Sequence, residues 1–293
     1  MRTKIILVVI FLEVFIYVII NPNAKEKLKH VINIKNETSI NSIKLENYVI
    51  GVVAAEMPAT FSYESLKAQA VASRTFIYEK IKNGNISYDN LIYDKGQAYI
   101  TKEEMKNKWN DDFDENYNII KNAVNSTKGE IITYQNEPIK AYYFSSSNGF
   151  TEDASRVFGE QNYLVSVDTS WDKESNEYYK EKIISVDEFK KIFNIDKEIN
   201  ISNIVRSKTD HVEKIRINEN EYTGVEVRKL LNLRSTDFEI SINENEVLLT
   251  TKGYGHGVGM SQYGANYLGK NGKTYEEIIK YFYQGVDIKK IFV

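Results

Sequence analysis

The chain has 293 residues, of which 42% are hydrophobic, enough to bury a full core in one large domain or two small ones. Its 38 basic and 41 acidic residues leave a formal net charge of only -3, and no basic patch is interleaved with aromatic residues. These features exclude nucleic acid as an expected partner. The sequence has no cysteine, which excludes disulfides, thiolate catalysis and cysteine-bound zinc.

The first residues predict a membrane anchor. Arg2 and Lys4 precede a run at 5–20 that is apolar apart from one glutamate. The run is slightly shorter than the about 20 residues that usually span hydrocarbon, but a lysine can snorkel and the bilayer can thin. No small-residue cleavage site follows, which favours an uncleaved anchor over a removed signal peptide. The basic flank favours a cytoplasmic N-terminus and places the rest of the chain on the other side.

We therefore expect an anchor at residues 1–22, a polar linker at 23–43 and one large domain at 44–293. The alternation of helical and strand-like segments predicts an α+β fold, in which helices pack on antiparallel sheets. The composition changes within 183–250, and this stretch is expected to form a smaller inserted lobe.

The first helix of the domain, at 45–58, carries an acidic side chain where the helical period predicts an apolar one. Its apolar stripe consists of Leu45, Tyr48, Val49, Val52 and Val53. Glu56 falls near the middle of this stripe, so desolvation is expected to raise its pKa towards the range of a general acid. The alternative is a solvated glutamate at a frayed helix end, because Pro58 follows.

A longer helix is predicted at 63–82, with Ser62 as its N-cap. Arg74 lies beside the apolar stripe of this helix rather than opposite it, so its side chain either reaches inward or covers apolar surface with its stem. Another helix is expected at 114–127.

Strands are predicted at 130–134 and 139–144, joined in a hairpin by the turn at 136–138. The serines that follow, at 145–147, are not in a nucleophile-elbow pattern, so serine catalysis has little support. A strand-like segment at 163–167 precedes a loop at 170–173.

Within the candidate lobe, the periodicities predict helices at 186–193 and 224–231 and strands at 212–217 and 238–242. The chain then closes with two helical segments at 261–268 and 274–282.

Before these last helices, alternating glycines occupy positions 253, 255, 257 and 259, in the segment GYGHGVGMSQYGA. Glycine at these positions lets the backbone approach a substrate or another strand closely. The dinucleotide-binding and phosphate-loop patterns do not fit the segment. A lone histidine, His256, is expected in a hydrogen-bonded support role rather than as a metal ligand.

Four segments of the chain, VIGVVAAEMPATFSYESLKAQAVASRTF, FSSSNGFTED, SWD and GYGHGVGMSQYGA, together resemble the stage II sporulation protein D family. The resemblance implies a lytic transglycosylase that cleaves peptidoglycan glycan strands during engulfment in endospore formation. It also implies a single-pass location in the mother-cell membrane, with the catalytic domain facing the space around the forespore. The implied partners are stage II sporulation proteins P, an amidase, and M, a membrane protein.

The same resemblance assigns roles to particular residues. Glu56 matches the catalytic acid of the family, and Arg74, Lys173 and Tyr263 match positions thought to line its substrate groove. The expected substrate-binding set is completed by Ser146, Asn148 and His256.

Some relatives hold a metal through cysteine and histidine near the segment that matches 145–149. This chain has serine and asparagine there, so we expect no metal and no cofactor.

Ordinary glycosidases need two carboxyl groups, whereas the motif around Glu56 supplies one. A transglycosylase needs only one, because the C6 hydroxyl of N-acetylmuramic acid (MurNAc) replaces water as the nucleophile. Three alternatives stay open: a hydrolytic muramidase that uses Glu56 with Asp172, a non-catalytic amidase enhancer that binds glycan, and a membrane-anchored scaffold.

Overall fold

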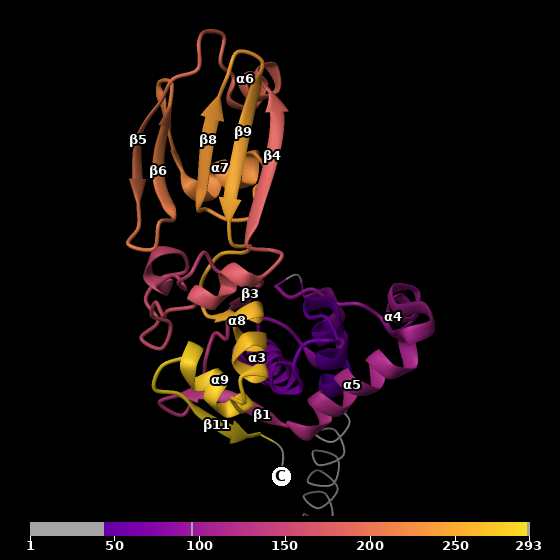
Figure 1. Cartoon of the computed structure of the whole chain (residues 1–293). Helices are drawn as coiled ribbons and strands as arrows, with labels where there is room; N and C mark the ends of the chain where they lie inside the picture. The colour runs from indigo at the N-terminus through magenta and orange to yellow at the C-terminus, as the bar shows by residue number, and fades with distance from the viewer. Residues whose placement is uncertain (1–43, 95, 292–293) are drawn as a thin grey trace, which may run out of the picture.

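The computed structural model describes residues 44–94 and 96–291 and divides them into a helical body and a β-rich lobe that stands on it (Figure 1). Each part has its own cluster of buried apolar side chains. The predicted anchor at 5–20 and the linker at 23–43 lie outside the described residues. Within those residues, none of the helices has the length and apolar character needed to cross a membrane.

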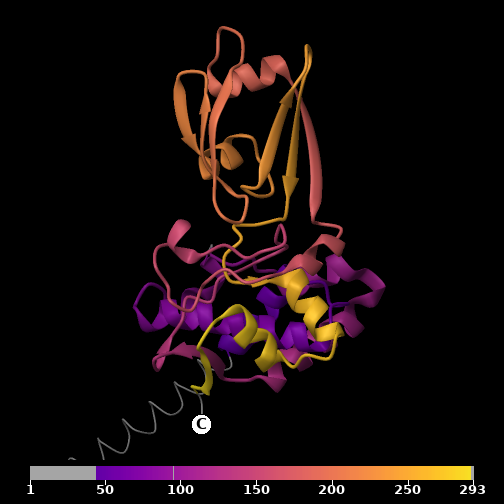
Figure 2. The same cartoon turned by 60° about the vertical axis from the view of Figure 1, so that its left-hand side comes forward.

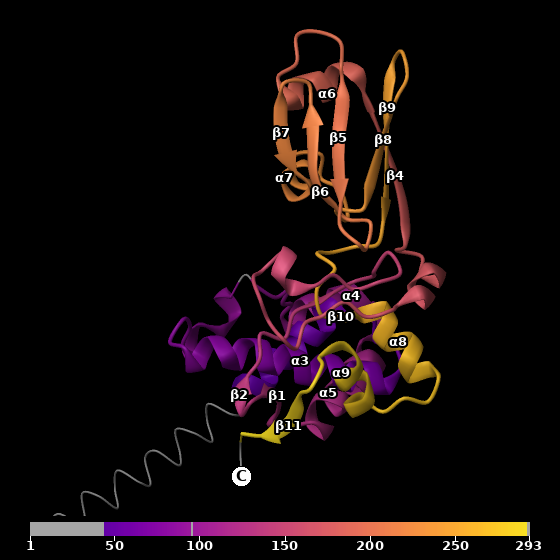
Figure 3. The same cartoon turned by 90° about the vertical axis from the view of Figure 1, so that its left-hand side faces the viewer.

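The body is built around the long helix α3 (Tyr63–Lys82), which contacts most other elements of the body. A helix over 44–56 precedes it, and α4 (Lys102–Trp109) and α5 (Phe113–Ser126) follow it. The last two helices, α8 (Gln262–Lys270) and α9 (Tyr275–Phe282), return from the far end of the chain to pack on α3 (Figures 1 and 3).

Helix α3 begins and ends where the sequence predicts. The Ser62 side chain accepts a hydrogen bond from the amide of Ser65, and Glu64 lies in the positive first turn. The helix ends before Gly84, whose φ of 72° is the left-handed conformation that glycine adopts most easily. The described part of the 44–56 helix buries all five residues of the apolar stripe that leads to Glu56.

The strands of the body form two small sheets. Strand β1 (Glu130–Tyr134) pairs antiparallel with β11 (Asp287–Lys290) on one side and with β2 (Glu137–Pro138) on the other. Strand β3 (Tyr143–Phe144) instead pairs in parallel with β10 (Met260–Ser261).

The predicted hairpin is therefore correct in its first strand and wrong in its second. Gln135 and Asn136 both have positive φ, at 51° and 70°, and make the chain reverse two residues earlier than expected. The strand that pairs with β1 is β2, which stops at Pro138, before the predicted strand begins. Of the predicted strand at 139–144, only Tyr143–Phe144 forms a strand, β3, and it pairs with β10.

The lobe contains two three-stranded antiparallel sheets, ordered β4-β9-β8 and β5-β6-β7, with two helices packed on them (Figure 3). Its elements are β4 (Tyr179–Ser185), α6 (Val186–Phe193), β5 (Ile201–Arg206), β6 (Val212–Ile217), β7 (Asn220–Thr223), α7 (Gly224–Leu230), β8 (Phe238–Ile242) and β9 (Glu246–Lys252). The chain enters the lobe by β4 and leaves it by β9. Because these two strands pair with each other, the lobe begins and ends at the same place on the body (Figure 2).

The α+β class is confirmed, and the bounds of α6, β6 and β8 agree with those predicted. The predicted strand at 163–167 is wrong: these residues form no strand, and the bridge of Phe150 with Asp168 lies just beyond them. The predicted loop at 170–173 belongs to a short 3₁₀ helix, η4 (Ser170–Glu174). Helix α4 and the strands β4, β5, β7, β9, β10 and β11 were not predicted from the sequence.

Candidate active site

Glu56 ends the first described helix and lies half-buried where that helix meets α8. Its Oε1 accepts a hydrogen bond from the backbone N–H of Ala98 at 2.8 Å, and its Oε2 accepts one from the side-chain amide of Gln262 at 3.1 Å. The carboxyl group is thus held by two segments that are far from it in sequence. Its partners are an amide N–H and an amide side chain, and neither is a second acid.

A glycine in the Glu56 helix allows the 97–101 segment to supply one of these donors. A Cβ on Gly51 would lie 2.3 Å from the ring of Tyr99, so only glycine leaves room for that ring against the helix. Tyr99 also stacks on Tyr48 at 5.5 Å, and the N–H of Ile100 donates to the carbonyl of Gly51. These contacts fix the adjacent Ala98 N–H at the Glu56 carboxyl.

A polar network lies behind Glu56. The Tyr48 hydroxyl donates to Gln97 Oε1 at 3.1 Å, and Gln97 Nε2 donates to the Tyr143 hydroxyl at 2.9 Å. Burial is the main cause that raises the pKa of both tyrosines, and the nearby Glu56 raises each pKa further. Both phenols are therefore neutral and serve as hydrogen-bonding groups.

Burial raises the pKa of the Glu56 carboxyl above its ordinary value, and the hydrogen bonds from Ala98 and Gln262 oppose this shift only in part. The direction agrees with the prediction made from the apolar stripe. A carboxyl that keeps its proton more readily than usual, at a half-buried position, has the property required of a general acid.

Asp172 occupies a different environment from Glu56. It is only 1% exposed, and its Oδ2 accepts hydrogen bonds from the Ser147 N–H at 2.7 Å and from the Ser261 hydroxyl at 2.5 Å. Burial raises its pKa to about 6. This carboxyl ties η4 to the start of α8 and has no surface on which a sugar or a water could react.

Arg74 does reach inward, but its partner is not the candidate site. Its side chain is 0% exposed and makes two hydrogen bonds to the Glu46 carboxylate, at 2.9 and 2.6 Å. Further N–H groups donate to the carbonyls of Glu130 and Val124. No part of the guanidinium is open to solvent in this structure, and the predicted contact of Arg74 with substrate stays a prediction.

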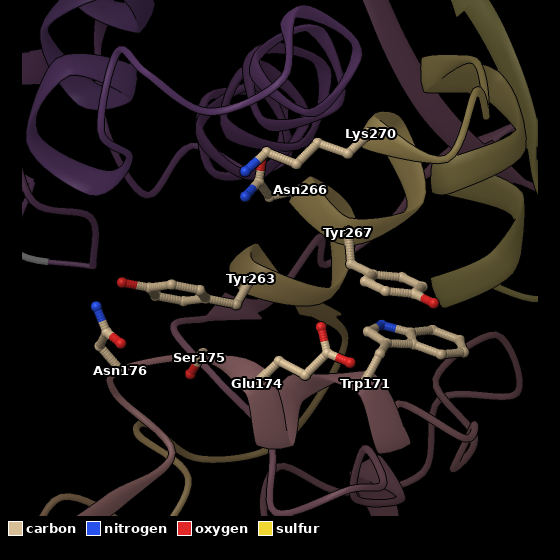
Figure 4. Close-up of a pocket in the computed structure, with 8 residues that line it drawn as sticks. All are labelled: Trp171, Glu174, Ser175, Asn176, Tyr263, Asn266, Tyr267 and Lys270. Carbon is tan, nitrogen blue, oxygen red and sulfur yellow. The ribbon is translucent and has the colours of Figure 1, made fainter.

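Tyr263 lines a pocket of about 220 Å³ beside the Glu56 region (Figure 4). Its ring packs edge-on against Phe61 at 5.1 Å, and it directly follows Gln262, the partner of Glu56. Four residues of α8 at helical spacing form one wall of the pocket, namely Tyr263, Asn266, Tyr267 and Lys270. The segment 171–176 forms the opposite wall, where Trp171 stacks on Tyr267 at 5.2 Å.

The glycine segment lies against the backbone of 142–148. All four alternating glycines have positive φ, and a Cβ on Gly259 would lie 2.1 Å from the carbonyl oxygen of Tyr142. The close approach that the glycines permit is therefore to another part of the chain. It brings β10 beside β3 and sets the start of α8 next to Glu56.

Three predicted substrate-binding residues lie along this contact. Ser146 is 1% exposed and faces the Ser175 hydroxyl at 3.1 Å, and its expected contact with substrate stays a prediction. The side-chain amide of Asn148 donates to the Thr209 carbonyl and to Asp237, both in the lobe.

His256 is half-buried between aromatic rings, and its Nδ1 accepts a hydrogen bond from the Val258 N–H. Burial lowers its pKa to about 4, so the ring is neutral at physiological pH. This geometry is that of a support residue.

Lys173 lies exposed in η4 with its Cε near Gly149, where an added Cβ would meet it at 3.5 Å. Its predicted contact with substrate, like that of Tyr263, stays a prediction. The side chains of 44–291 that the structure describes contain no cluster of three or more histidine, cysteine, aspartate or glutamate residues arranged to hold a metal ion.

Several contributors to the site carry no signal of their own in the sequence. The Ala98 N–H helps to hold the catalytic candidate, and Asn266 and Lys270 line the pocket. The i, i+3, i+4, i+7 spacing from Tyr263 to Lys270 is the one pattern that could have indicated a shared helix face.

The fold and site thus define an α+β protein with one half-buried acid of raised pKa next to an aromatic and polar pocket. Comparison with known proteins places the chain in a family. The SpoIID family, described as "Stage II sporulation protein", matches residues 33–134. The chain is 42% identical over 264 residues to stage II sporulation protein D of Bacillus amyloliquefaciens and also to that of Bacillus subtilis strain 168, covering 86% of this chain and 76% of each relative.

The chain therefore belongs to the stage II sporulation protein D family. It is also 27% identical over 297 residues to the amidase enhancer of Bacillus subtilis strain 168, covering 81% of this chain and 40% of that protein.

Proposed function

We propose that the chain is a lytic transglycosylase that cleaves the bond between MurNAc and N-acetylglucosamine in peptidoglycan glycan strands, leaving 1,6-anhydro-MurNAc ends. The observation that carries this proposal is the environment of Glu56: a half-buried carboxyl of raised pKa, hydrogen-bonded to amides and not to a second acid. A one-acid site fits a reaction in which the nucleophile comes from the substrate.

In the proposed reaction, the protonated Glu56 donates its proton to the glycosidic oxygen as the C1–O bond breaks. The resulting carboxylate then accepts the proton of the C6 hydroxyl while that oxygen bonds to C1 of the oxocarbenium ion. Glu56 ends the cycle protonated, and no water is consumed. Intramolecular attack also reduces the entropic cost of the second step.

Membership of the stage II sporulation protein D family supports a role for this activity in sporulation. We propose that the chain acts during engulfment in endospore formation, on strands already stripped of stem peptides. We propose a single-pass anchor in the mother-cell membrane that leaves the catalytic domain facing the forespore. The proposed partners are the amidase and the membrane protein, stage II sporulation proteins P and M.

The test is mass spectrometry of the products formed by the full chain on peptide-free glycan strands, with wild type beside Glu56→Gln. The proposal expects anhydro ends from wild type and none from the variant. Reducing ends, heavier by one water, would instead indicate a hydrolytic muramidase. The burial of Asp172 counts against that alternative, because its carboxyl cannot activate a water.

A second candidate function is supported by the similarity to the amidase enhancer. In this case the chain binds glycan and stimulates a partner amidase without cutting the strand itself. Unchanged stimulation by Glu56→Gln, with no cleavage by wild type, would favour this function over the transglycosylase.

A further inference from the structure

The pocket beside Glu56 contains one exposed cation at the end of a helix face. Lys270 is the last of the four α8 residues that line the pocket, after Tyr263, Asn266 and Tyr267. Figure 4 shows Lys270 and Asn266 pointing to the same side, with Glu174 on the opposite wall. Lys270 makes no ion pair within the described residues, whereas the nearby Lys273 is paired with Glu277 at 3.0 Å.

Helix α8 connects this cation to the candidate acid. Gln262, at the start of α8, holds Glu56, and Lys270 lies at the end of the same helix. At a rise of about 1.5 Å per residue, these two positions are separated by about 12 Å along the axis. A ligand that extends from Glu56 along α8 therefore passes Tyr263 and Asn266 before it reaches the Lys270 ammonium.

The lining of the pocket indicates the chemistry of such a ligand. Tyr263 and the stacked pair of Trp171 with Tyr267 provide flat faces suited to sugar rings, and Asn176 provides an amide group suited to acetamido and hydroxyl groups. Asn266 offers only its Nδ2 donor, because its Oδ1 accepts a hydrogen bond from the Ser62 N–H at 2.8 Å. Glu174 can accept hydrogen bonds from sugar hydroxyls. The unpaired ammonium adds a preference for a negative charge on one ring.

We propose that Lys270 is a specificity-determining residue that binds the free lactyl carboxylate of a MurNAc ring lying along α8. This inference rests on the proposed function, since that function places a glycan strand at Glu56. A lactyl group still joined to a stem peptide is a neutral amide and offers no charge to Lys270. The same contact therefore distinguishes stripped from unstripped rings, with Glu174 on the opposite wall disfavouring the reverse orientation.

The test measures binding of full-chain Glu56→Gln, in which cleavage cannot confuse the result, to two forms of peptide-free glycan strand. One form keeps its lactyl carboxylates, and in the other they are converted to methylamides. Adding Lys270→Met is expected to weaken binding to the first form roughly tenfold and to leave the second unchanged. Lys270→Arg should retain most of the preference for the carboxylate form. Lys280 is an exposed lysine of α9 outside the pocket, and Lys280→Met should change the affinity for neither form.

An equal loss on both strands, no loss on either, or no glycan binding at all would overturn the inference. Its failure is distinct from failure of the proposed function. Anhydro products from wild type, together with no effect of Lys270→Met on binding, would overturn the inference but support the transglycosylase. Selective binding without cleavage would support the role of Lys270 in a protein that does not cut glycan.

Discussion

At the scale of single residues, Glu56 and Arg74 show how one sequence pattern leads to two different roles. Both are polar residues on or beside an apolar helix stripe, and both have buried surroundings. Arg74 finds a carboxylate of opposite charge and becomes part of the core. Glu56 is hydrogen-bonded only by uncharged donors and is partly exposed to solvent, so its proton is available for transfer.

The raised pKa of Glu56 predicts a pH-dependent stability difference. Because the folded pKa exceeds the ordinary value of 4.5, the contribution of Glu56 to stability is full below that value and is lost as pH rises through the folded pKa. Glu56→Gln should therefore melt increasingly above wild type as pH rises, with the difference vanishing in acid. Thermal unfolding across the pH range measures it.

Glu104→Gln is the matched control, for which the pH dependence of the stability difference from wild type has the opposite sign. The hydrogen bond from the Thr101 N–H lowers the pKa of Glu104, so the stability it contributes is present above the ordinary pKa and is lost as pH falls through the folded pKa. A melting temperature of Glu56→Gln that falls below wild type with rising pH would contradict the desolvated environment assigned to Glu56.

The buried Arg74 pair predicts a large loss of stability from Arg74→Met. Removing the guanidinium leaves the Glu46 carboxylate buried without its counter-charge, which costs about 3–5 kcal/mol in comparable pairs. Urea unfolding measures the change. Lys82 lies on the same helix as Arg74 and makes an exposed ion pair with Glu137. Lys82→Met breaks this pair and should cost less than about 1 kcal/mol.

A structural role for Arg74 also requires that glycan binding survive. At a temperature where Arg74→Met remains folded, its affinity for glycan strands should equal that of wild type. Selective loss of affinity with normal stability would support the substrate-binding role that the family resemblance implies for Arg74.

At the scale of elements, the glycine segment determines where α8 begins. Strand β10 lies against β3 only because the 253–259 backbone can pass close to 142–148 with positive φ at alternate residues. Beyond β10, Ser261 caps α8 by accepting from the Gly264 N–H, and Gln262 then meets Glu56. The segment therefore acts on the site by positioning a helix.

Gly259→Ala is expected to destabilise the protein more than Gly272→Ala. Both glycines have φ near 82°, so either alanine adopts a conformation that costs roughly 1 to 3 kcal/mol. At Gly259 the new Cβ would also meet the Tyr142 carbonyl at 2.1 Å, whereas Gly272 has open space within 4 Å. Urea unfolding of both variants isolates the loss of stability caused by the clash with Tyr142. Equal losses would mean that the β3–β10 contact accommodates the added Cβ without cost.

At the scale of the whole molecule, the lobe is joined to the body by a buried carboxylate as well as by two chain crossings. Glu152, in the body, is 4% exposed. Its Oε2 accepts hydrogen bonds from the Ser207 hydroxyl at 2.8 Å and from the Thr209 hydroxyl at 2.6 Å, both on the lobe. Glu152 thereby connects the turn at 207–211 to the body.

Glu152→Ala should loosen this junction while both cores stay folded. The expected result is faster hydrogen exchange at the amides of 207–211, with unchanged exchange in α3. Hydrogen exchange followed by mass spectrometry measures both regions. The control is Glu239→Ala, which changes an exposed glutamate of β8 and should alter neither region. Unaltered exchange in Glu152→Ala would show that the other contacts of the junction, such as those of Asn148 with Thr209 and Asp237, hold this turn without Glu152.

Local patterns sufficed for elements whose periodicity and caps are strong. The bounds of α3 and β1 and the inward face of the Glu56 helix could be predicted because apolar spacing and capping residues act within a few positions. The strand partner of 139–144 could not, because β3 pairs with β10, more than a hundred residues away. Edge strands such as β4 and β5 were missed because their exposed apolar residues break the alternation.

The same division holds for the candidate site. By itself, the sequence determined that Glu56 is an acid on an apolar helix face, because desolvation follows from spacing along one helix. Only the tertiary structure decided which groups surround it, since Ala98, Gln262 and the α8 face reach Glu56 through a long-range strand pairing and helix packing. Side-chain contacts across such distances depend on the packing of the whole body, which local spacing does not encode.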